Sequence, residues 1–474
     1  MKPRVVVLGS GIAGLVAAHE LARRGHAVTL VEAASIPGGR TSTWRDAQGR
    51  EVDTGLHVVA DHYVNLRDVL DQVGAARRLH WVEKHTYLRA GRAPMAWSFS
   101  PHRPPFHLLR PMRAMPITWA ERLALGWAGA PLAAMTQADL AALDTETYAS
   151  WHHRHRLGRG FVLDLAAAGC DAATFQTVEQ AAARPVISWL KYLMRNRKAG
   201  NVGLFQGTLT DTLVGPLLRS MEAAGGSLRL NTAVTGWVLD GRRVVGVQVA
   251  RHRGAGPVHS ADGRLAVVSG TEEVIPCDHV ISALSVQGLQ AILTPTLAAD
   301  AGLTPMMGLG TTPAMSVIVW FDRLIEPMPE GAPLCTGCVM RDFVDLRRLG
   351  RATGAAGSVY QFVLTRADVR QSHTDTQIIA DCVADLKAVW PAAAAAQVVD
   401  GAVERIGAAM FAAVPGAHAK RPAAATRLGG LVLAGDWTQH EFNASMEGAA
   451  FSGRRAANVV LRALGEPEAP LRVP

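Results

Sequence analysis

The feature that most constrains the fold of this chain is a glycine-rich turn between two apolar segments near its N-terminus. Residues 5–8 have the pattern of a buried strand, residues 9–14 follow as Gly-Ser-Gly-Ile-Ala-Gly, and residues 15–24 have helical spacing. A second apolar segment at 27–31 ends at Glu32. This order of strand, GxGxxG, helix, strand and acid predicts a dinucleotide-binding α/β unit.

The glycines and the acid of this unit each have a physical role. Gly9 allows a tight turn, and Gly11 lets the backbone approach a pyrophosphate. Gly14 lets the helix pack closely on the strand, so that the helix N-terminus faces the anion. Glu32 can accept hydrogen bonds from an adenosine ribose, which disfavours a 2′-phosphate at that position.

Composition limits the other possibilities. The chain has 474 residues, 49% of them hydrophobic, which is long enough for about two or three domains with sizeable cores. No uninterrupted apolar run reaches the roughly 18 residues of a membrane span, and the glycine motif argues against a signal peptide. The formal charge of +8 suits an anionic membrane surface or a nucleic acid, but nothing else in the sequence supports nucleic-acid binding.

Five cysteines in a chain of this length do not form a disulfide framework, and their odd number indicates a reducing, cytoplasmic location. Cys335 and Cys338 form a lone CxxC without the second pair that zinc would require. We therefore predict no metal site.

Two further segments indicate which dinucleotide binds. Gly38 and Gly39 permit a close backbone approach and Arg40 supplies a cation for phosphate, soon after Glu32. Near the other end of the chain, a buried strand at 431–434 runs into Gly435-Asp436, and a helix begins near residue 446. An acid after a strand, followed by a helix start of small residues, suits the ribityl hydroxyls and the O2 edge of a flavin.

The chain resembles the plant and cyanobacterial phytoene and ζ-carotene desaturases of the FAD-dependent amine oxidase superfamily. The likeness lies in the GGR turn at 38–40, in Thr54-Gly55-Leu56-His57, in the strand at 319–323, and in AGDWTQHEFNASMEGAAFSGRRAA at 434–457. Hydroxysqualene dehydroxylases are related but usually lack the NASMEGA form. The resemblance implies an α/β fold, with a Rossmann-like FAD-binding domain interleaved with a substrate domain of mixed or antiparallel sheet plus helices.

The resemblance also assigns cofactor contacts. Val234 would lend its backbone to the adenine, Asp436 would bind the diphosphate–ribityl region, and the helix start at Met446 would hold the isoalloxazine. Glu447 would either share that role or stabilise the helix N-terminus. The full set of residues expected to bind FAD is Gly9, Gly11, Ala13, Gly14, Glu32, Ala33, Gly38, Gly39, Arg40, Gly55, Leu56, His57, Val234, Gly435, Asp436 and Met446.

The two domains are expected to alternate along the chain. FAD-binding segments are expected at residues 1–85, 201–290 and 418–474, and substrate and membrane-contact segments at 86–200 and 291–417. Within them, residues 200–207 are expected to form a loop, and residues 251–270, rich in Gly and His, an inserted hairpin loop.

Residues 84–120 combine cations with aromatic and methionine side chains and contain no carboxylate. This combination suits the headgroup boundary of an anionic leaflet. A solvated loop that packs partly on the core, or another partner, is the alternative. The cations are Lys84, Arg89, Arg92, Arg103, Arg110 and Arg113, and the interleaved residues are Met95, Trp97, Phe99, Phe106, Met112, Met115 and Trp119.

By resemblance, the reaction expected is the desaturation of an apolar polyisoprenoid, with hydride transfer to the flavin N5 in a dry tunnel. His57, Asp61 and His62 are the weak catalytic candidates, and Tyr192, Phe205 and Trp437 the weak substrate contacts. The absence of a second GxGxxG favours reoxidation by an external acceptor such as a quinone. Hydroxysqualene dehydroxylation, amine oxidation and a non-redox isomerase remain alternatives, although the low aromatic content of 6% argues against an amine-binding cage.

Overall fold

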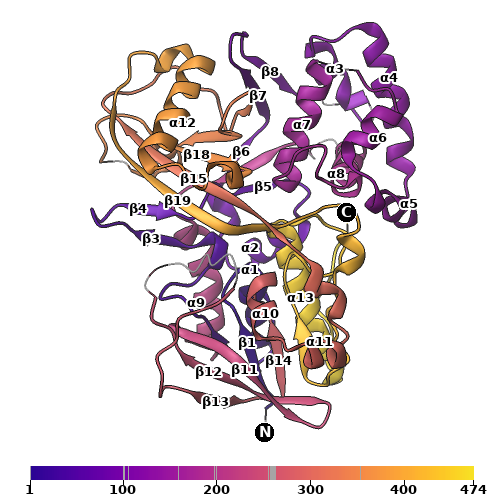
Figure 1. Ribbon diagram of the computed structural model, residues 1–474, viewed down its shortest axis with the longest axis vertical. Helices are drawn as coiled ribbons and strands as arrows, with labels where there is room; N and C mark the ends of the chain where they lie inside the picture. The colour runs from indigo at the N-terminus through magenta and orange to yellow at the C-terminus, as the bar shows by residue number, and fades with distance from the viewer. Residues whose placement is uncertain are drawn as a thin grey trace.

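The structure is a computed structural model that describes residues 2–473, except residues 100, 101, 105, 159, 197, 199, 255, 257–262 and 353. Its two largest sheets are a parallel sheet of five strands and a mixed sheet of seven strands, and helices pack around them (Figure 1). The predicted fold class is therefore confirmed. Among the described residues, no helix is long and apolar enough to cross a membrane.

The parallel sheet forms the core of the lower part of the molecule in Figure 1, which we call the cofactor half. Its strand order is β10–β2–β1–β14–β20, and all neighbouring strands are parallel. These strands span Ser227–Arg229, Ala27–Val31, Arg4–Leu8, His279–Ser282 and Leu431–Leu433, in that order.

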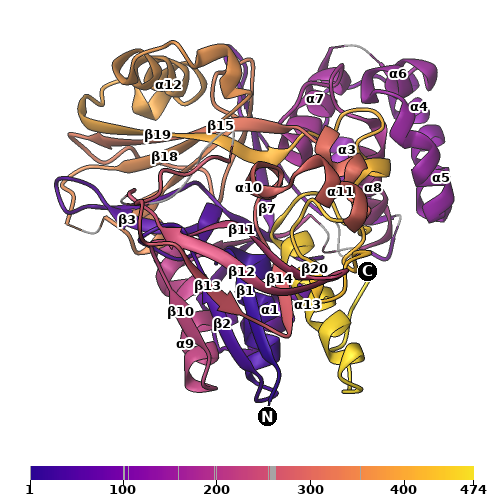
Figure 2. The same cartoon turned by 60° about the horizontal axis from the view of Figure 1, so that its bottom comes forward.

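Alternate residues of β1 face opposite sides of this sheet, as the period of a strand requires. Val5 and Val7 pack with α1, α9 and α13, whereas Val6 and Leu8 pack with α10 and with the antiparallel sheet β11–β12–β13. Figure 2 shows that antiparallel sheet crossing in front of β1 and β14. The helices are α1 (Ile12–Ala22), α2 (Val64–Gln72), α9 (Gly215–Ala223), α10 (Val286–Ile292), α11 (Pro295–Ala301) and α13 (Met446–Ala463), and the strands are β11 (Thr232–Asp240), β12 (Arg243–Arg251) and β13 (Glu273–Pro276).

The mixed sheet has seven strands in the order β19–β15–β18–β17–β16–β7–β8. Val317 and Val319 of β15 face α12, and Ile318 between them faces the rest of the molecule. The strands are β19 (Val398–Phe411), β15 (Thr311–Phe321), β18 (Val359–Thr365), β17 (Asp342–Asp345), β16 (Leu334–Thr336), β7 (Lys84–Arg89) and β8 (Met95–Ser98), and α12 is Asp375–Val389.

The remaining helices gather at the upper right of Figure 1 as a helical lobe, residues 106–195, with its own buried cluster. Its members are α3 (Leu109–Ala114), α4 (Trp119–Gly129), α5 (Gln137–Ala142), α6 (Tyr148–Arg154), α7 (Phe161–Thr174) and α8 (Ala183–Arg195).

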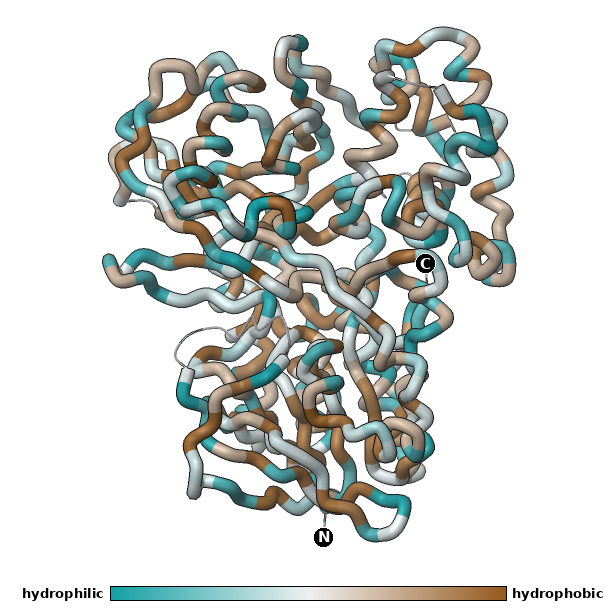
Figure 3. The backbone as a smooth tube through the Cα atoms, in the orientation of Figure 1, coloured by the Kyte–Doolittle hydropathy of each residue, from teal (hydrophilic) through white to brown (hydrophobic). Residues whose placement is uncertain are grey.

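Two small sheets lie between these parts. The hairpin of β3 (Thr43–Arg45) and β4 (Glu51–Asp53) ends in a hydrophilic tip (Figure 3). The second sheet has the order β5–β9–β6, formed by Val58–Ala60, Val202–Phe205 and Leu79–Val82.

Strand β9 corrects the expectation of a loop at 200–207. Glycines at 200, 203 and 207 favoured a loop, but pairing with β5 and β6 stabilises an extended backbone. Gly203 pairs with Val59 of β5 and with Trp81 of β6, and a Cβ there would make an ordinary van der Waals contact with the Trp81 ring at 3.5 Å. The predicted insert at 251–270 lies between β12 and β13, and its residues 255 and 257–262 are outside the described residues.

Candidate functional site

The turn between β1 and α1 forms an open cradle. Gly9 has a φ of +95°, and a Cβ there would lie 2.9 Å from the carbonyl oxygen of Ala283. A Cβ on Gly14 would lie 1.9 Å from the carbonyl oxygen of Gly9, so only glycine fits. A Cβ on Gly11, by contrast, would meet nothing within 4 Å. The space beside Gly11 is therefore where a ligand can approach the backbone.

The N-terminus of α1 is free to bind an anion. Its N-cap, Gly11, provides no side-chain cap, and no acidic residue lies in the first turn. The first N–H groups of a helix have no partner within the helix and lie at the positive end of its dipole. Together with the space beside Gly11, this arrangement fits the diphosphate of FAD.

Glu32 is buried where β2 ends, and its carboxylate is fixed by the chain around it. One oxygen accepts hydrogen bonds from the Ser10 backbone (2.8 Å) and hydroxyl (2.6 Å), and the other accepts from the Ala34 backbone (2.9 Å). The Thr232 N–H donates to the Glu32 carbonyl oxygen (2.8 Å), which brings the segment containing Val234 to the same end of the sheet. The Asn231 N–H donates in the same way to the Ala34 carbonyl oxygen (3.0 Å). Ala33, between Glu32 and Ala34, is half-buried.

The Gly38-Gly39-Arg40 turn folds back onto the first glycine loop. The Gly38 N–H donates to the Ser10 carbonyl and hydroxyl oxygens, each at 3.1 Å. Gly39 has a φ of +55°, and a Cβ there would lie 3.3 Å from the Gly11 Cα. Both predicted glycine motifs therefore meet at one place.

Arg40 and Asp436 form an ion pair, although 396 positions separate them in the sequence. The guanidinium of Arg40 lies 2.8 Å from Asp436 Oδ1 and also donates to the carbonyl oxygen of Ala409 (2.7 Å). The charge of Asp436 raises the pKa of Arg40. This pair joins the N-terminal turn to the end of β20.

The strand–helix junction at the C-terminal end is similarly constrained. Gly435 has a φ of +145°, and a Cβ there would lie 2.4 Å from the Trp437 indole nitrogen. The Ser445 hydroxyl caps α13 by accepting from the Gly448 N–H (3.1 Å), and Met446 is the first helical residue. Gly453 allows α13 to pack on α1, since a Cβ there would lie 2.2 Å from the Ala13 carbonyl oxygen.

Glu447 does stabilise a helix N-terminus, but that of α2 rather than its own. Its carboxylate accepts hydrogen bonds from the backbone of Asn65 (2.9 Å) and Leu66 (2.8 Å), which lie in the first turn of α2. Burial raises the pKa of this carboxyl, and these hydrogen bonds oppose the rise. Helix spacing alone does not reveal this contact, because the two partners lie far apart in the sequence.

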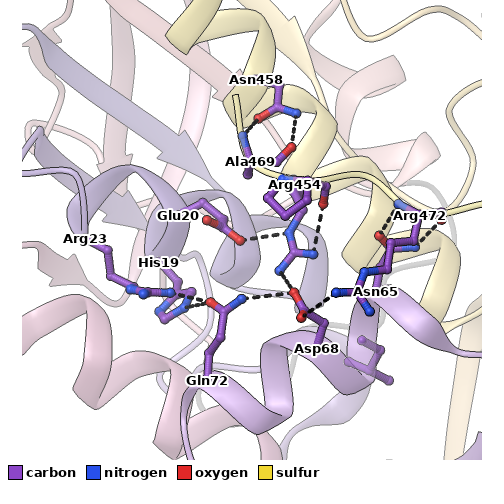
Figure 4. A network of polar contacts seen from close by, with 12 residues as sticks. His19, Glu20, Arg23, Asn65, Asp68, Gln72, Arg454, Asn458, Ala469 and Arg472 are labelled. Carbon is purple, nitrogen blue, oxygen red and sulfur yellow. Dashed lines mark hydrogen bonds and ion pairs between the residues drawn. The ribbon is translucent and has the colours of Figure 1, made fainter. Parts of the chain in front are cut away.

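A charge network centred on a buried arginine joins α1, α2 and α13 (Figure 4). Arg454 of α13 is fully buried and lies 2.8 Å from Glu20 of α1 and 2.8 Å from Asp68 of α2. It also donates to the Pro470 carbonyl oxygen (3.2 Å) in the C-terminal tail. The side-chain amide of Asn458 donates to the carbonyl oxygen of Ala469 in the same tail (2.8 Å) and accepts from its N–H (2.7 Å).

His57 follows Gly55 and Leu56 at the start of β5. Its Nδ1 lies 2.9 Å from the Gly55 carbonyl oxygen. Burial, with the nearby charges of Arg40 and Arg341, lowers the pKa of His57 to about 4. The imidazole is therefore neutral at pH 7. Arg341, which the sequence did not single out, lies beside Asp342 at 2.6 Å.

The other weak candidates have different surroundings. His62 stacks on Tyr192 of α8 with ring centroids 5.0 Å apart, and meets the edge of Tyr63 at 5.1 Å. Burial raises the pKa of Tyr63 to about 12, so its hydroxyl keeps its proton at neutral pH. Asp61, in contrast, forms an ion pair with Arg67 at 2.9 Å.

Phe205 and Trp437 lie apart from this aromatic group. Phe205 packs in the core cluster around α1 and α9. Trp437 packs in the cluster on the opposite face of the sheet, and its indole N–H donates to the Leu284 carbonyl oxygen (3.0 Å). Of the three predicted substrate contacts, Tyr192 alone therefore stacks on another predicted site residue.

A comparison with protein families matches the model of flavin containing amine oxidoreductases over residues 12–461. The 15-cis-phytoene desaturase of Synechococcus elongatus is 23% identical over 469 residues, which cover 97% of this chain and 96% of that protein. A probable zeta-carotene desaturase of the same organism is 25% identical over 489 residues, covering 97% and 99%.

Solved structures share the fold at lower identity. Cyclohexylamine oxidase from Brevibacterium oxydans superposes with a TM-score of 0.67 at 17% identity, covering 98% of this chain and 100% of the other. Putrescine oxidase bound to putrescine gives a TM-score of 0.67 at 15% identity, covering 98% and 99%.

Proposed function

Because the chain belongs to the flavin-containing amine oxidoreductase family and is an FAD-dependent oxidoreductase, we propose that it desaturates an apolar polyisoprenoid such as phytoene or ζ-carotene. The observation that carries this proposal is the length of the likeness to carotenoid desaturases. It covers 97% of this chain and 96% of the phytoene desaturase, so both the cofactor half and the helical lobe have a counterpart.

FAD supplies an acceptor for hydride at N5, as in other flavin oxidations. In the proposed reaction one C–H bond would give up a hydride and the neighbouring C–H bond a proton, so that a C=C bond forms, and bound FAD would take up both in becoming FADH₂. The protein would orient the chain and exclude water. The cofactor would be held by the residues expected from the sequence, which line the cradle from Gly9 to Arg40 and the junction from Gly435 to Met446.

The polar side chains nearest this region suit such a passive role. His57 is neutral at pH 7, Tyr63 is protonated, and the carboxylate of Asp61 is paired with Arg67. None of the three holds a free charge toward an apolar ligand. Reoxidation by an external quinone is part of the proposal, because the sequence has no second dinucleotide motif.

We place the membrane contact on α4 and the segment before it. Trp119, Leu123 and Trp127 recur every four residues on α4 and are 79%, 73% and 86% exposed. Phe106 and Leu109 are also exposed, and Arg110 and Arg113 lie beside them. Large apolar side chains next to arginines suit the interface of an anionic bilayer, where an apolar substrate would be dissolved.

This placement narrows the predicted contact region of 84–120. Trp97 and Phe99 are only half-exposed and pack around His85, at 5.9 and 5.7 Å between ring centroids. Arg89 forms an ion pair with Asp164 of α7. The first half of the region is therefore partly packed, and the exposed stripe extends beyond residue 120.

The test is anaerobic bleaching of the flavin near 450 nm, an approximate position for oxidised flavin. Holoenzyme on liposomes receives 15-cis-phytoene, ζ-carotene, hydroxysqualene or a polyamine in separate runs. Bleaching by a carotene with a more conjugated product supports the proposal. Bleaching by hydroxysqualene or a polyamine alone would replace it with those activities, and bleaching by none would favour a non-redox isomerase.

A further inference from the structure

Glu447 is a buried carboxylate that the proposed reaction does not use. Its side chain lies fully buried in the first turn of α13. It accepts hydrogen bonds from the Asn65 side chain (2.7 Å) and from the backbone of Asn65 (2.9 Å) and Leu66 (2.8 Å). All these partners are N–H donors. A protonated carboxyl would have to donate its own O–H to an acceptor, so this set of partners fits the ionised form.

The negative charge of Glu447 has no cation directly against it. Glu447 forms no ion pair within the described part of the chain. Arg454, about two turns further along α13, lowers the pKa of this carboxyl but pairs with Glu20 and Asp68. Arg472 of the C-terminal tail, which Asn65 also contacts, pairs with Asp68 (3.6 Å). Hydrogen bonds therefore hold the Glu447 carboxylate in place.

The other titratable groups around this helix start are neutral or engaged with other residues. Burial and the charge of Glu447 raise the pKa of Tyr63 and of Tyr192, so both hydroxyls keep their protons at neutral pH. Nearby cations are held by other groups: Arg40 by Asp436, Arg341 by Asp342, Arg421 by the carbonyl oxygens of Asp436 and Trp437, and Arg455 by the charge of Glu441.

The first turn of α13 combines free donors with this charge. The Ser445 hydroxyl accepts from the Gly448 N–H, whereas the N–H groups of Met446 and Glu447 donate to no other residue that the structure describes. Free N–H groups at a helix start favour a negative charge in front of them. The Glu447 carboxylate opposes that preference from within the same turn. This helix start can therefore donate hydrogen bonds to a flavin while disfavouring a full negative charge on it.

We propose that the charge of Glu447 keeps reduced FAD in its neutral form, with a proton at N1 as well as hydrogen at N5. The inference rests on the proposed position of the flavin at the start of α13, and not on the identity of the substrate. A fixed unit charge roughly 10 Å away in a partly buried site changes a protonation equilibrium about tenfold. Neutral reduced FAD holds both the hydride and the proton that the proposed desaturation removes, so no protein base has to keep the proton.

The experiment measures the reduction potential of the FAD-loaded protein by equilibration with redox dyes, from mildly acidic to mildly alkaline pH. Uptake of two protons with two electrons makes the potential fall twice as steeply with pH as uptake of one. The absorption spectrum of the reduced flavin separately distinguishes the neutral from the anionic form. Wild-type protein is expected to keep the two-proton slope and the neutral spectrum through pH 7. Glu447→Gln should change to the one-proton slope about one pH unit lower than wild type, a tenfold change in proton affinity.

Two further variants separate the charge of Glu447 from its packing. Glu447→Asp keeps the charge and should keep the wild-type slope. Asn65→Ala is the matched control, because it removes a hydrogen bond to the same carboxylate without changing its charge. It should lower the stability of the protein and leave the slope unchanged.

An anionic spectrum of the reduced wild-type protein at pH 7 would overturn the inference, and so would a wild-type slope in Glu447→Gln. If Glu447→Gln does not retain FAD, the wild-type spectrum alone decides. Failure of every carotene to bleach the flavin would reject the proposed function, but it would leave these measurements and the inference unaffected.

Discussion

Two helices of equal length, α1 and α4, differ in how they are surrounded. Each has eleven residues; all residues of α1 are buried, whereas Ala128 is the single buried residue of α4. Helix α1 lies between the parallel sheet and α13, with no side chain facing solvent. Helix α4 presents two tryptophans and a leucine outward. The first helix is packed entirely within the fold, whereas the proposed partner of the second, a membrane surface, lies outside the chain.

The largest effect on the cofactor half is expected from adding a side chain at Gly14. Gly14→Val should abolish FAD retention, because a Cβ there would already lie 1.9 Å from the Gly9 carbonyl oxygen. The flavin-to-protein absorbance ratio of the purified protein measures this. Gly126→Ala in α4 is the control, since nothing lies within 4 Å of its Cβ position, and it should keep its flavin. Normal flavin content in Gly14→Val would contradict the closeness of β1 and α1.

The next effect concerns the charges that join α1, α2 and α13. Arg454→Met should lower the free energy of unfolding by about 3 kcal/mol, because buried Glu20 would keep only its pair with Arg24, and half-buried Asp68 only its pair with Arg472. Arg462→Met on the same helix should cost less than about 1 kcal/mol, since its pair with Glu468 is exposed. Urea unfolding followed by circular dichroism measures the loss of stability in both variants. Equal losses would show that the buried ion pairs stabilise the fold no more than the exposed pair does.

In the helical lobe the expected loss is in binding rather than in stability. Replacing Trp119, Leu123 and Trp127 by serine should weaken binding to anionic vesicles at least about 30-fold, or about 2 kcal/mol, because three exposed apolar side chains are removed. The melting temperature should stay within a few degrees of wild type. Co-sedimentation with phosphatidylglycerol vesicles measures the binding, and unchanged binding would remove α4 as the contact.

The smallest effect is expected for His85 on β7, in the mixed sheet. Burial lowers the pKa of His85 to about 4, so the unfolded chain binds more protons than the folded protein between about pH 4 and 6.5. Stability therefore falls as the pH drops through this window. His85→Phe keeps a ring between Trp97 and Phe99 and should flatten the slope by well under about 1.4 kcal/mol per pH unit. An identical slope in both proteins would contradict this assignment.

The sequence predicted the parts of the site that local chemistry determines. Gly9, Gly14 and Gly38 have conformations or contacts that exclude side chains, and such positions stand out in a sequence. The pairing of Arg40 with Asp436 could not be predicted, because it depends on how β20 lies against the first turn. The contact of Glu447 with α2 could not be predicted either, because it depends on how α13 packs against α2.

The helical lobe was less predictable. The cations and aromatic residues at 84–120 indicated a contact surface, but the division between packed Trp97 and exposed Trp119 depends on tertiary packing.

The cofactor half combines β1 and α1 with β20 and α13, which lie far apart in the sequence, and this has a consequence for protein synthesis. Strand β1 leaves the ribosome before β20, α13 and the tail that bonds Arg454, which lie more than about 400 residues further along the chain. At about 5–20 residues per second, β1 waits roughly 20–85 s for these partners. The proposed FAD site is therefore complete only once β20 and α13 have been synthesised. A message truncated before residue 431 would encode every N-terminal glycine of the motif but neither Asp436 nor α13.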